Sequence, residues 1–528
     1  MGAGTNRMNI FVVRRASIGV ADWICSRGEE YKKRGVAVSY DTRNNSFVFA
    51  KEAAAVFASK GIKTYIFKET APVPVLSFTV WSQNLAAGVM ITASHNPKEY
   101  NGYKVYCEGG VQIAPEMADV ITAKIESYSD FTKLPVPDYE ALKKTRMLSY
   151  VSEKVIRAYY DRINALAAYR EINEKYADEL TTVYSPLHGA GAKYVAKAFK
   201  NAGLGKNFYI VKEQEKPDGN FPTVPVPNPE NIAAFTLALK LAEEKNADVV
   251  IATDPDSDRM GAFVKTKEGG YVNLTGNRIG CLFINYLTEL RKSLGLLKDD
   301  SFAVSTIVST DLAGEICKAR GIEFKSVLTG FKYIGDLITE ENKDSFILGF
   351  EESYGFLTEG YARDKDGVAA ALVFAEMALY YKHKYGLTLA EVLDGVYKEY
   401  GYRHESAFSI DLPGESGREK INKIMRFARE NAETFPGGGY TVKSLMDVLK
   451  GTETVYRAGS AKTHKIDLPE SDVLKYKLSN GWFAIRPSGT EPKIKIYVGI
   501  KAKSQAKADA DADALKKYLK EKILKIIE

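Results

Sequence analysis

A serine and a histidine stand side by side, as Ser94 and His95, in the segment TASHNPKEYNGYKVY that follows the apolar run GVMI. A serine hydroxyl at a strand end can be phosphorylated where a phosphate donor and positive charge are near, and it would then carry about −1.5 to −2 charges. His95 and Lys104 could assist proton transfer, Lys104 once its neighbours have lowered its pKa. A plain turn is the alternative, because Ser, Asn and Pro are common in turns, and the segment alone favours it.

Three carboxylates cluster in ADVVIATDPDSDRMGAF, where an apolar run leads into Asp254, Asp256 and Asp258. The alternate spacing and the bend at Pro255 would aim them at one point, and their mutual repulsion calls for a cation. Hard oxygen ligands of this kind suit Mg²⁺. An EF-hand is excluded because Arg259 occupies its obligatory glycine position. A capped acidic turn is the structural alternative, and an aspartyl-phosphate phosphatase is a functional rival.

A third apolar run leads into two carboxylates and a hydroxyl in ILGFEESYGF, at Glu351, Glu352 and Ser353. Such groups suit hydrogen bonds to sugar hydroxyls. Downstream, the segment YARDKDG supplies Arg363 and Lys365 as candidate phosphate partners. A helix-capping cluster explains the same residues equally well.

The fourth segment, RPSGTEPKIKIY, combines an arginine with a polar turn. Arg486 offers a planar fork for a phosphate, and Ser488, Gly489 and Thr490 can form a turn whose amides and hydroxyls surround an anion. A simple β-hairpin turn is the alternative, and the two interpretations are level. The sequence has no Walker A segment, no GxGxxG after a strand and no HExxH, which removes three common enzyme classes.

The elements that position these loops alternate between short β-branched runs and amphipathic helical stretches. GVAVSYDTR, LTTVYSPLHGAG and SFAVSTIVST are each followed by a helical stretch and a further strand. This alternation predicts βαβ units with mixed or parallel sheets, and open α/β sheets bind ligands at the carboxyl ends of their strands. Near the end, GWFAIRPSGTEPKIKIYVGI reads as strand, turn and strand before a long Ala/Lys/Asp helix. We therefore expect three α/β domains and a smaller α+β domain, over residues 1–176, 177–298, 299–400 and 401–528.

The bulk composition indicates an ordinary globular protein of 528 residues, 45% hydrophobic and 27% charged. Its net charge of +6, from 73 basic and 67 acidic side chains, is too weak to indicate a nucleic-acid partner. The four cysteines are far apart with no CxxC pair, which favours a reducing cytoplasm. Apolar runs are far shorter than the roughly 20 residues that span a bilayer, so we expect no membrane partner.

Taken together and in this order, the four loops resemble those of the α-D-phosphohexomutase superfamily, which includes phosphoglucomutase and phosphomannomutase. The four segments resemble, in turn, its phosphoserine, Mg²⁺-binding, sugar-binding and phosphate-binding loops, and the resemblance covers nearly the whole chain. LHGAG and PDGNFPTVPVPNPE are similar to segments of the longer phosphoglucomutase/phosphopentomutase branch. The resemblance implies four domains around a central cleft, with a sugar phosphate as the partner.

The resemblance also implies a mechanism that interconverts glucose 1-phosphate and glucose 6-phosphate. Phospho-Ser94 would give its phosphoryl group to the sugar, and the bisphosphorylated sugar would turn round and return its other phosphoryl group. Lys104 would be the general acid/base beside His95, and glucose 1,6-bisphosphate would be the priming activator. Mg²⁺ would be held by Ser94, Asp254, Asp256 and Asp258. The substrate-binding residues would be Arg259, Thr329, Gly330, Glu351, Ser353 and Lys365. The phosphate-binding residues would be Arg486, Ser488, Gly489 and Thr490.

The chain departs from the family pattern in two places. Relatives normally open with a strand carrying an FGTxGxRG segment, whereas this chain starts at MGAGTNRMN, where that segment should have ended. We therefore expect the first sheet to lack a strand and the site to lack an arginine. Some relatives also carry a histidine after the Glu-x-Ser motif; here Gly355 follows Tyr354, so no second base is assigned.

Three functional hypotheses follow. The chain is a mutase, a phosphatase with Asp254 or Ser94 as nucleophile, or an inactive sugar-phosphate-binding homologue. For a mutase, the longer-branch segments favour glucose 1-phosphate, with mannose or pentose phosphates as alternatives. A monomer in the cytoplasm is expected.

Overall fold

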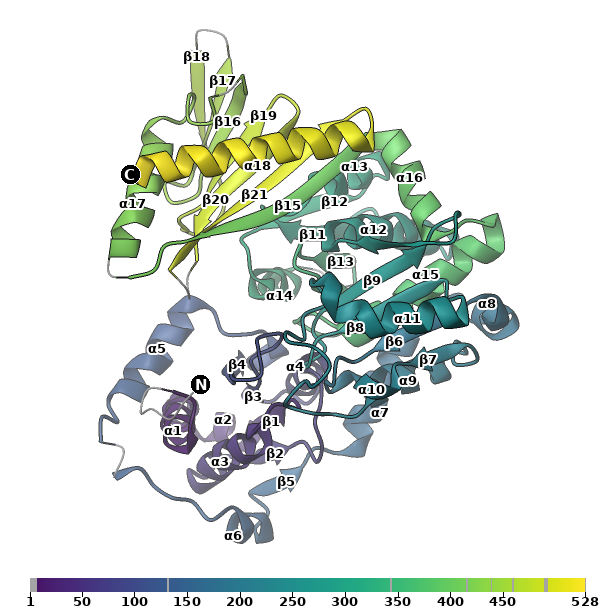
Figure 1. Ribbon diagram of the computed structural model, residues 1–528. Helices are drawn as coiled ribbons and strands as arrows, with labels where there is room; N and C mark the ends of the chain where they lie inside the picture. Colours follow the sequence, from purple (N-terminus) through teal and green to yellow (C-terminus); the bar gives the residue numbers. More distant parts are fainter. Residues whose placement is uncertain are drawn as a thin grey trace. The chain divides into compact units, whose positions relative to one another are not determined.

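The computed structural model describes residues 7–130, 133–341, 344–414, 416–437, 439–457, 460–488 and 492–527. The chain divides into two compact units, each described here by itself (Figure 1). The first unit comprises Met1–Val304, Arg320–Lys325 and Gly330–Val392. The second unit comprises Ser305–Ala319, Ser326–Thr329 and Leu393–Glu528.

The first sheet contains five strands: β1 (Val36–Tyr40), β2 (Thr64–Ile66), β3 (Ala87–Ile91), β4 (Tyr103–Cys107) and β5 (Leu148–Tyr150). Their order is β4-β3-β1-β2-β5. Strand β1 is parallel to β2 and β3, β2 is parallel to β5, and β4 is antiparallel to β3. The sheet is therefore mixed, with its parallel strands inside.

The second sheet repeats this plan with β6 (Thr182–Ser185), β7 (Phe208–Ile210), β8 (Val249–Thr253), β9 (Met260–Lys265) and β10 (Tyr271–Leu274). Its order is β10-β9-β8-β6-β7, with β6 parallel to β7 and β8. The third sheet contains β11 (Phe302–Thr306), β12 (Glu323–Val327), β13 (Phe346–Phe350) and β14 (Phe356–Thr358), in the order β12-β11-β13-β14. The division between the two units runs through β11 and β12.

Helices follow most of these strands. Between residues 10 and 164 they are α1 (Ile10–Ser26), α2 (Glu29–Arg34), α3 (Ser46–Ser59), α4 (Val73–Ser82), η1 (Glu108–Gly110), α5 (Pro115–Glu126), α6 (Tyr139–Lys144) and α7 (Glu153–Asn164). From residue 170 to 293 they are α8 (Arg170–Tyr176), η3 (Ala177–Glu179), α9 (Gly191–Asn201), α10 (Lys212–Glu215), η4 (Ile232–Phe235), α11 (Thr236–Lys245) and α12 (Gly276–Ser293). Farther on are α13 (Leu312–Ala319), α14 (Phe331–Glu340), α15 (Gly367–Tyr385) and α16 (Leu389–Tyr400).

The fourth sheet lies in the second unit and is antiparallel throughout. Its strands are β15 (Tyr402–Asp411), β16 (Val442–Asp447), β17 (Thr452–Arg457), β18 (Ser460–Lys465), β19 (Leu474–Leu478), β20 (Gly481–Pro487) and β21 (Lys493–Ala502), in the order β15-β21-β20-β19-β16-β17-β18. Helices α17 (Ser416–Glu430) and α18 (Gln505–Ile527) pack on it and on each other, and α18 runs along the sheet (Figure 1).

Three central strands are buried along their whole length: β3, β8 and β13. A strand covered on both faces needs an almost continuous apolar sequence, and AGVMI, VVIAT and FILGF supply it. Their carboxyl ends are where the chain turns polar, at Thr92, Asp254 and Glu351. Each predicted catalytic loop of the first unit therefore begins where a buried strand ends.

The structure confirms the predicted fold class: three α/β sheets precede an antiparallel sheet with its helices. The fourth sheet has seven strands, and the β16–β18 meander was not expected from the sequence. The exact domain boundaries stay a prediction, and the expected N-terminal departure falls partly on residues 1–6, outside the described part. Among the described residues, no helix combines the length and apolarity needed to cross a bilayer.

Helix α15 is apolar on every side and is buried from Gly367 to Tyr381. It carries one buried acid, Glu376, whose carboxylate accepts hydrogen bonds from the Tyr286 hydroxyl at 2.7 Å and from Asn173 Nδ2 at 2.6 Å. The backbone N–H of Tyr169 also donates to it, at 3.2 Å. Burial raises the pKa of Glu376 to about 7, although these hydrogen bonds oppose the shift.

We expect Glu376 to make the protein less stable as the pH rises from 4.5 to about 7. In that window the folded protein keeps a proton that the unfolded chain has lost, so its free energy of unfolding falls with pH. In Glu376→Gln this fall, about 3 kcal/mol for the shift involved, should disappear. The amide can satisfy the same partners, with its oxygen toward Asn173 and its nitrogen toward Tyr286.

The measurement is the urea midpoint of wild type and variant at pH 5 and pH 8. Glu171→Gln, which changes an exposed acid on the nearby helix α8, is the control and should follow wild type. Parallel pH profiles for wild type and Glu376→Gln would contradict this account.

Candidate active site

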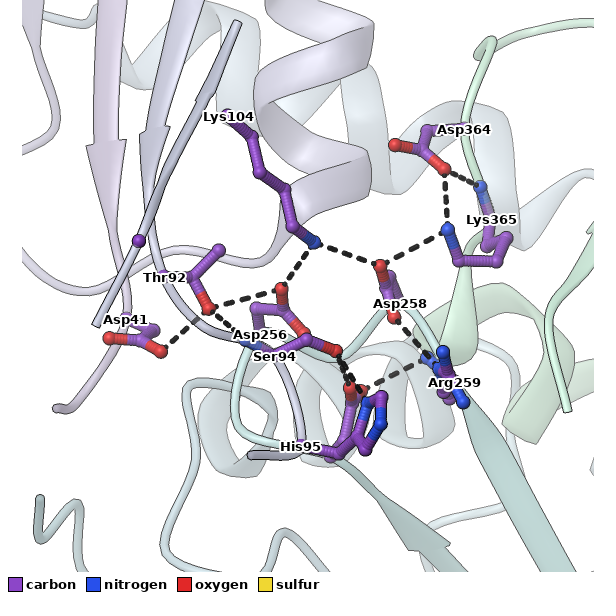
Figure 2. A network of polar contacts seen from close by, with 12 residues as sticks. Asp41, Thr92, Ser94, His95, Lys104, Asp256, Asp258, Arg259, Asp364 and Lys365 are labelled. Atoms are coloured by element: carbon purple, nitrogen blue, oxygen red, sulfur yellow. Dashed lines mark hydrogen bonds and ion pairs between the residues drawn. The ribbon is translucent and has the colours of Figure 1, made fainter. Parts of the chain in front are cut away.

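Ser94 lies in a tight turn directly after β3, with a backbone φ of 50°. Its hydroxyl donates to Asp254 Oδ2 at 2.6 Å and lies 3.2 Å from His95 Nδ1. Its backbone N–H donates to Thr92 Oγ1 at 2.8 Å. The predicted serine is thus held against the predicted carboxylate cluster by both its side chain and its backbone (Figure 2).

Arg43 fixes the backbone of this turn, a role that was not predicted. Its two terminal nitrogens donate to four backbone oxygens, those of Ser94, Asn96, Pro97 and Tyr100, at 2.5 to 3.0 Å. The guanidinium is buried and lies 3.2 Å from Asp41 Oδ2. Because the guanidinium presents donors in a rigid plane, it sets the shape of the whole serine loop.

Thr92 connects the serine loop to two buried acids. Its hydroxyl lies 2.7 Å from Asp41 Oδ2 and 3.1 Å from Asp256 Oδ2, and one hydroxyl proton serves both (Figure 2). Burial raises the pKa of Asp41 to about 6, while Arg43 acts to lower it. Asp41 and Arg43 belong to the DTR segment after β1, so a polar group at the end of an apolar strand was the signal that could have found them.

The three predicted aspartates form one cluster. Asp254, Asp256 and Asp258 are all buried, and one carboxylate oxygen of each lies within 4.8 Å of the others. Among the described residues, Asp256 Oδ1 and Asp258 Oδ1 are buried without a hydrogen-bond partner. A buried carboxylate oxygen without a donor is costly, and a hard cation satisfies several such oxygens at once. The cluster therefore fits a divalent metal ion.

The backbone of this aspartate loop is clamped by three helix N-termini. Successive carbonyls of Pro255, Asp256 and Ser257 accept the N–H groups of Ala190 (2.8 Å), Val73 (2.9 Å) and Gly367 (3.0 Å). Those residues begin, or directly precede, helices α9, α4 and α15. The positive ends of three helix dipoles thus surround an acidic loop, which lowers the cost of gathering its charges.

Two lysines approach the cluster from different strands and loops. Lys104 on β4 places Nζ 3.0 Å from Asp256 Oδ2 and 3.4 Å from Asp258 Oδ2. Lys365 places Nζ 3.2 Å from the same oxygen of Asp258 and 2.9 Å from Asp364 Oδ1. Asp364 also accepts a hydrogen bond from the buried hydroxyl of Tyr106 at 2.7 Å. Figure 2 shows both ammonium groups directed at Asp258.

The pKa shifts reflect competition between burial and charge. Burial alone would lower the pKa of Lys104, but Asp256 and Asp258 outweigh it and raise the pKa above the usual range. This is opposite to the lowered pKa expected from the sequence. Burial raises the pKa of Asp254 well above its usual value, and its two acidic neighbours add to the rise. For Asp258 burial is outweighed by Lys365 and Lys104, so its pKa is lowered.

His95 is kept neutral. Burial, together with the positive charge of Arg259, lowers the pKa of His95 to about 2, against the opposing effect of Asp258. Because the Ser94 hydroxyl donates its proton to Asp254, the neutral ring can donate from Nδ1 to Ser94 Oγ in the tautomer that carries its proton there. His95 is thus a neutral neighbour of the serine.

Arg259 and Glu351, two of the residues predicted to bind the sugar, are each held by backbone and charge contacts. The backbone N–H of Arg259 donates to Asp254 Oδ1 at 3.0 Å, and its guanidinium pairs with Glu230. Glu351 Oε1 accepts the N–H of Gly330 at 3.0 Å, and burial raises the pKa of Glu351 to about 7 while Lys365 acts to lower it. Two backbone contacts, Met260 N–H to the Tyr354 carbonyl and a bridge between residues 259 and 355, join this loop to the aspartate loop.

Of the predicted site residues, those that the structure brings together in the first unit are Ser94, His95, Lys104, Asp254, Asp256, Asp258, Arg259, Gly330, Glu351 and Lys365. Ser353 is half-buried in the same loop as Glu351. The functional candidates that sequence reasoning missed are Asp41, Arg43, Thr92, Glu230 and Asp364. Glu230 and Asp364 lie in the quoted segments PVPNPE and YARDKDG, where acids beside prolines and lysines were the available signal.

The remaining predicted residues belong to the second unit, which is treated separately. There Arg486 Nε donates to the Tyr497 hydroxyl at 3.2 Å, and the Ser488 N–H donates to the Lys493 carbonyl at 2.9 Å. Thr329 has a buried hydroxyl without a hydrogen-bond partner among the described residues. Gly489 and Thr490 lie outside the described residues.

Comparison with known sequences gives matches along nearly the whole chain. Four family models match, described as phosphoglucomutase/phosphomannomutase α/β/α domains I, II and III and C-terminal domain, over residues 1–131, 157–269, 275–400 and 437–517. A Staphylococcus saprophyticus protein named phosphoglucomutase is 35% identical over 514 residues, covering 95% of this chain and 88% of its own length. A Staphylococcus aureus phosphoglucomutase is 34% identical over 501 residues, covering 95% and 87%.

Solved structures with the same fold have diverged further in sequence. A putative phosphomannomutase from Thermus thermophilus superimposes with a TM-score of 0.70 at 21% identity, covering 98% of this chain and 97% of its own. Parafusin, a phosphoglucomutase from Paramecium, gives a TM-score of 0.70 at 16% identity, covering 98% and 92%. At such low identity these structures support the fold alone.

We expect Arg43→Met to loosen the serine loop selectively. The change removes the donors of four backbone carbonyls, so amide hydrogen exchange in peptides covering residues 92–106 should speed up by about tenfold or more. Arg34→Met is a matched control, because Arg34 also donates to backbone carbonyls, those of Asn84 and Leu85. The control should leave residues 92–106 unchanged. Equal exchange in that segment for wild type and Arg43→Met would show that Arg43 does not hold the loop.

Proposed function

The chain belongs to the phosphoglucomutase/phosphomannomutase family, and from this premise we propose that it is a phosphoglucomutase that interconverts glucose 1-phosphate and glucose 6-phosphate. The observation that carries the proposal is the hydrogen bond from the Ser94 hydroxyl to Asp254, at 2.6 Å. It joins a potential phosphoryl carrier to the carboxylate cluster that fits a cation.

In the proposed reaction Ser94 carries the phosphoryl group. The sugar hydroxyl attacks phosphorus, the bond from phosphorus to Ser94 Oγ breaks, and a new phosphorus–oxygen bond forms to the sugar. The hydroxyl proton passes to a base in the site, and the departing Oγ takes up a proton. The bisphosphorylated sugar then turns round, and the reverse step returns its other phosphoryl group to Ser94. The net reaction moves one phosphoryl group between two positions of the sugar.

The metal of the proposal is Mg²⁺, held by Asp254, Asp256, Asp258 and an oxygen of phospho-Ser94. When bound, it offsets the negative charge of the transferring phosphoryl group. The two carboxylate oxygens without donors, on Asp256 and Asp258, support this assignment because Mg²⁺ prefers oxygen ligands.

Lys104 is the proposed general acid/base, and its ammonium is held between two carboxylates. As an ammonium it is suited to protonate the departing Ser94 oxygen, and it recovers that proton in the reverse direction. His95, kept neutral, lies 3.2 Å from the hydroxyl of free Ser94, whose proton is donated to Asp254. Lys365 forms ion pairs with both Asp258 and Asp364. It is proposed to contact the phosphate of the substrate.

The sugar is proposed to bind through Glu351 and Ser353, with Arg259, Thr329 and Gly330 beside it. The phosphate that does not react is assigned to Arg486, Ser488, Gly489 and Thr490. Glucose is proposed because the most similar relatives reported above carry the name phosphoglucomutase. The proposal also includes a central cleft, glucose 1,6-bisphosphate as priming activator, a monomeric state and a cytoplasmic location.

We expect Ser94→Ala to lower kcat by about 10⁴-fold or more, because no residue remains to carry the phosphoryl group. The assay follows glucose 1-phosphate conversion after priming with glucose 1,6-bisphosphate, beside mannose 1-phosphate and ribose 1-phosphate. Glucose 1-phosphate should give the highest kcat/KM. Ser59→Ala, at an exposed serine on α3, should behave as wild type.

The same preparations test the phosphatase alternative. Wild type should carry one acid-stable phosphoryl group, located on Ser94 by mass spectrometry. An acid-labile phosphoenzyme, or one that survives in Ser94→Ala, would replace the mutase proposal with an aspartyl-phosphate mechanism.

We expect removal of divalent metal by EDTA to abolish activity and added Mg²⁺ to restore it. Mg²⁺ should also raise the thermal midpoint of the protein, because binding at a hundredfold excess over Kd stabilises the folded state by about 2.7 kcal/mol. Asp254→Asn, Asp256→Asn and Asp258→Asn should each lose that rise. Asp248→Asn is the control, because this acid of the same sheet region pairs with Lys382 outside the cluster. A rise that persists in all three cluster variants would place the cation elsewhere.

A further inference from the structure

A cavity of about 280 Å³ lies within the first unit, and none of the residues assigned to the reaction lines it. One wall is the segment after β2, the second is the start of α7, and the third is one face of α9; Figure 1 shows α7 and α9 side by side. The residues that line it are Phe67, Lys68, Glu69, Val151, Glu153, Ile156, Tyr160, Lys193, Tyr194 and Lys197. The volume is close to the lower end of typical small-ligand sites.

The charges of this cavity are arranged so that two cations stay available. Lys193 is paired with Glu69. Lys68 and Lys197 form no ion pair with any residue that the structure describes, and Lys197 Nζ lies 4.4 Å from the ring centre of Tyr160. Unpaired ammonium groups at the edge of a concave site attract anions, phosphate in particular.

Two tyrosines with buried rings supply phenol hydroxyls to the same cavity. Tyr160 and Tyr194 are each only 4% exposed, and their rings stack with centroids 5.9 Å apart. Within the described part of the chain, neither phenol hydroxyl has a hydrogen-bond partner in the protein. Neither hydroxyl oxygen is itself buried, so both are open to the cavity, where each can bond to water or to the hydroxyl group of a ligand.

We propose that this cavity is a second binding site, for a small sugar phosphate. Its phosphate binds between Lys68 and Lys197, and its hydroxyl groups bind Glu153 and the two tyrosine hydroxyls. The mixture of ammonium, phenol and carboxylate groups matches the mixture of anionic and hydroxyl groups on such a ligand. An inorganic anion would leave Glu153 and the tyrosines unused.

The walls of this site lead directly to the aspartate loop. The segment of Lys68 continues to Val73, whose N–H binds the Asp256 carbonyl at 2.9 Å. Helix α9, which carries Lys197, is preceded by Ala190, whose N–H binds the Pro255 carbonyl at 2.8 Å. A ligand that contacts both walls would restrain the two segments whose N–H groups bind the carbonyls of the aspartate loop. We therefore expect it to strengthen Mg²⁺ binding and, by linkage, to bind more tightly when Mg²⁺ is present.

The binding test titrates fructose 6-phosphate, and separately inorganic phosphate, into the full chain by calorimetry. Lys68→Ala and Lys197→Ala should weaken the binding of fructose 6-phosphate to this cavity by about tenfold or more. Any binding of the same compound to the active site should be unchanged. Lys200→Ala, an exposed lysine on the same helix that does not line the cavity, is the matched control and should behave as wild type. Inorganic phosphate should bind more weakly than fructose 6-phosphate.

Identical isotherms for wild type, Lys68→Ala and Lys197→Ala would overturn the site, and equal affinities for the two probes would overturn the assignment of a sugar phosphate. The link to Mg²⁺ is read from the Mg²⁺ concentration that gives half-maximal mutase rate, and this part alone rests on the proposed function. Fructose 6-phosphate should lower that concentration in wild type and Lys200→Ala but leave it unchanged in Lys197→Ala. An equal response in all three proteins would overturn the link, and calorimetry remains valid even if the chain is no mutase.

Discussion

The repulsion among three buried aspartates is the constraint on which the rest of the first unit depends. Their carboxylates lie within 4.8 Å of one another and away from water, where unpaired charges are costly. Lys104 and Lys365 offset part of this charge from two directions, and both contact Asp258. Arg259 adds a third positive charge, 3.9 Å from Asp258 Oδ1, yet two carboxylate oxygens still have no hydrogen-bond donor among the described residues. The cluster is arranged to be completed by a ligand.

The backbone contacts around the cluster also offset the repulsion among the aspartates. Three consecutive carbonyls of the aspartate loop accept N–H groups from the starts of α4, α9 and α15, which belong to three different sheet systems. Each helix directs its positive end toward the loop, and each fixes one peptide group of it. The loop therefore cannot shift without breaking contacts to all three regions. This explains why chemistry at one loop needs most of the length of the first unit to support it.

The positions of many of the candidate site residues could be predicted from the sequence. A fully buried strand must be apolar, so the polar residues that follow β3, β8 and β13 are conspicuous as candidates: Ser94, the aspartates and Glu351. Contacts between segments that are distant in the chain could not be predicted from the sequence. The position of Arg43 after an apolar strand could have marked it as a candidate, but the sequence does not show that its guanidinium binds four carbonyls some fifty residues later. The protonation of Lys104 was likewise mistaken, because it depends on two acids that are adjacent only in space.

Each of the three loops contains a non-glycine residue with positive φ, as several other turns of the described chain do. Ser94, Ser257 and Tyr354 all have positive φ, at 50°, 53° and 67°, in the region that costs most non-glycine residues energy. Each is held there by contacts from elsewhere: Arg43 binds the Ser94 carbonyl, Gly367 the Ser257 carbonyl and Met260 the Tyr354 carbonyl. In all three cases the clamp takes the carbonyl of the strained residue itself. These contacts come from segments distant in sequence, so the conformation of each of the three residues depends on the packing of the loops against the rest of the unit. The serine is therefore presented to the carboxylates by the fold as a whole, before any substrate arrives.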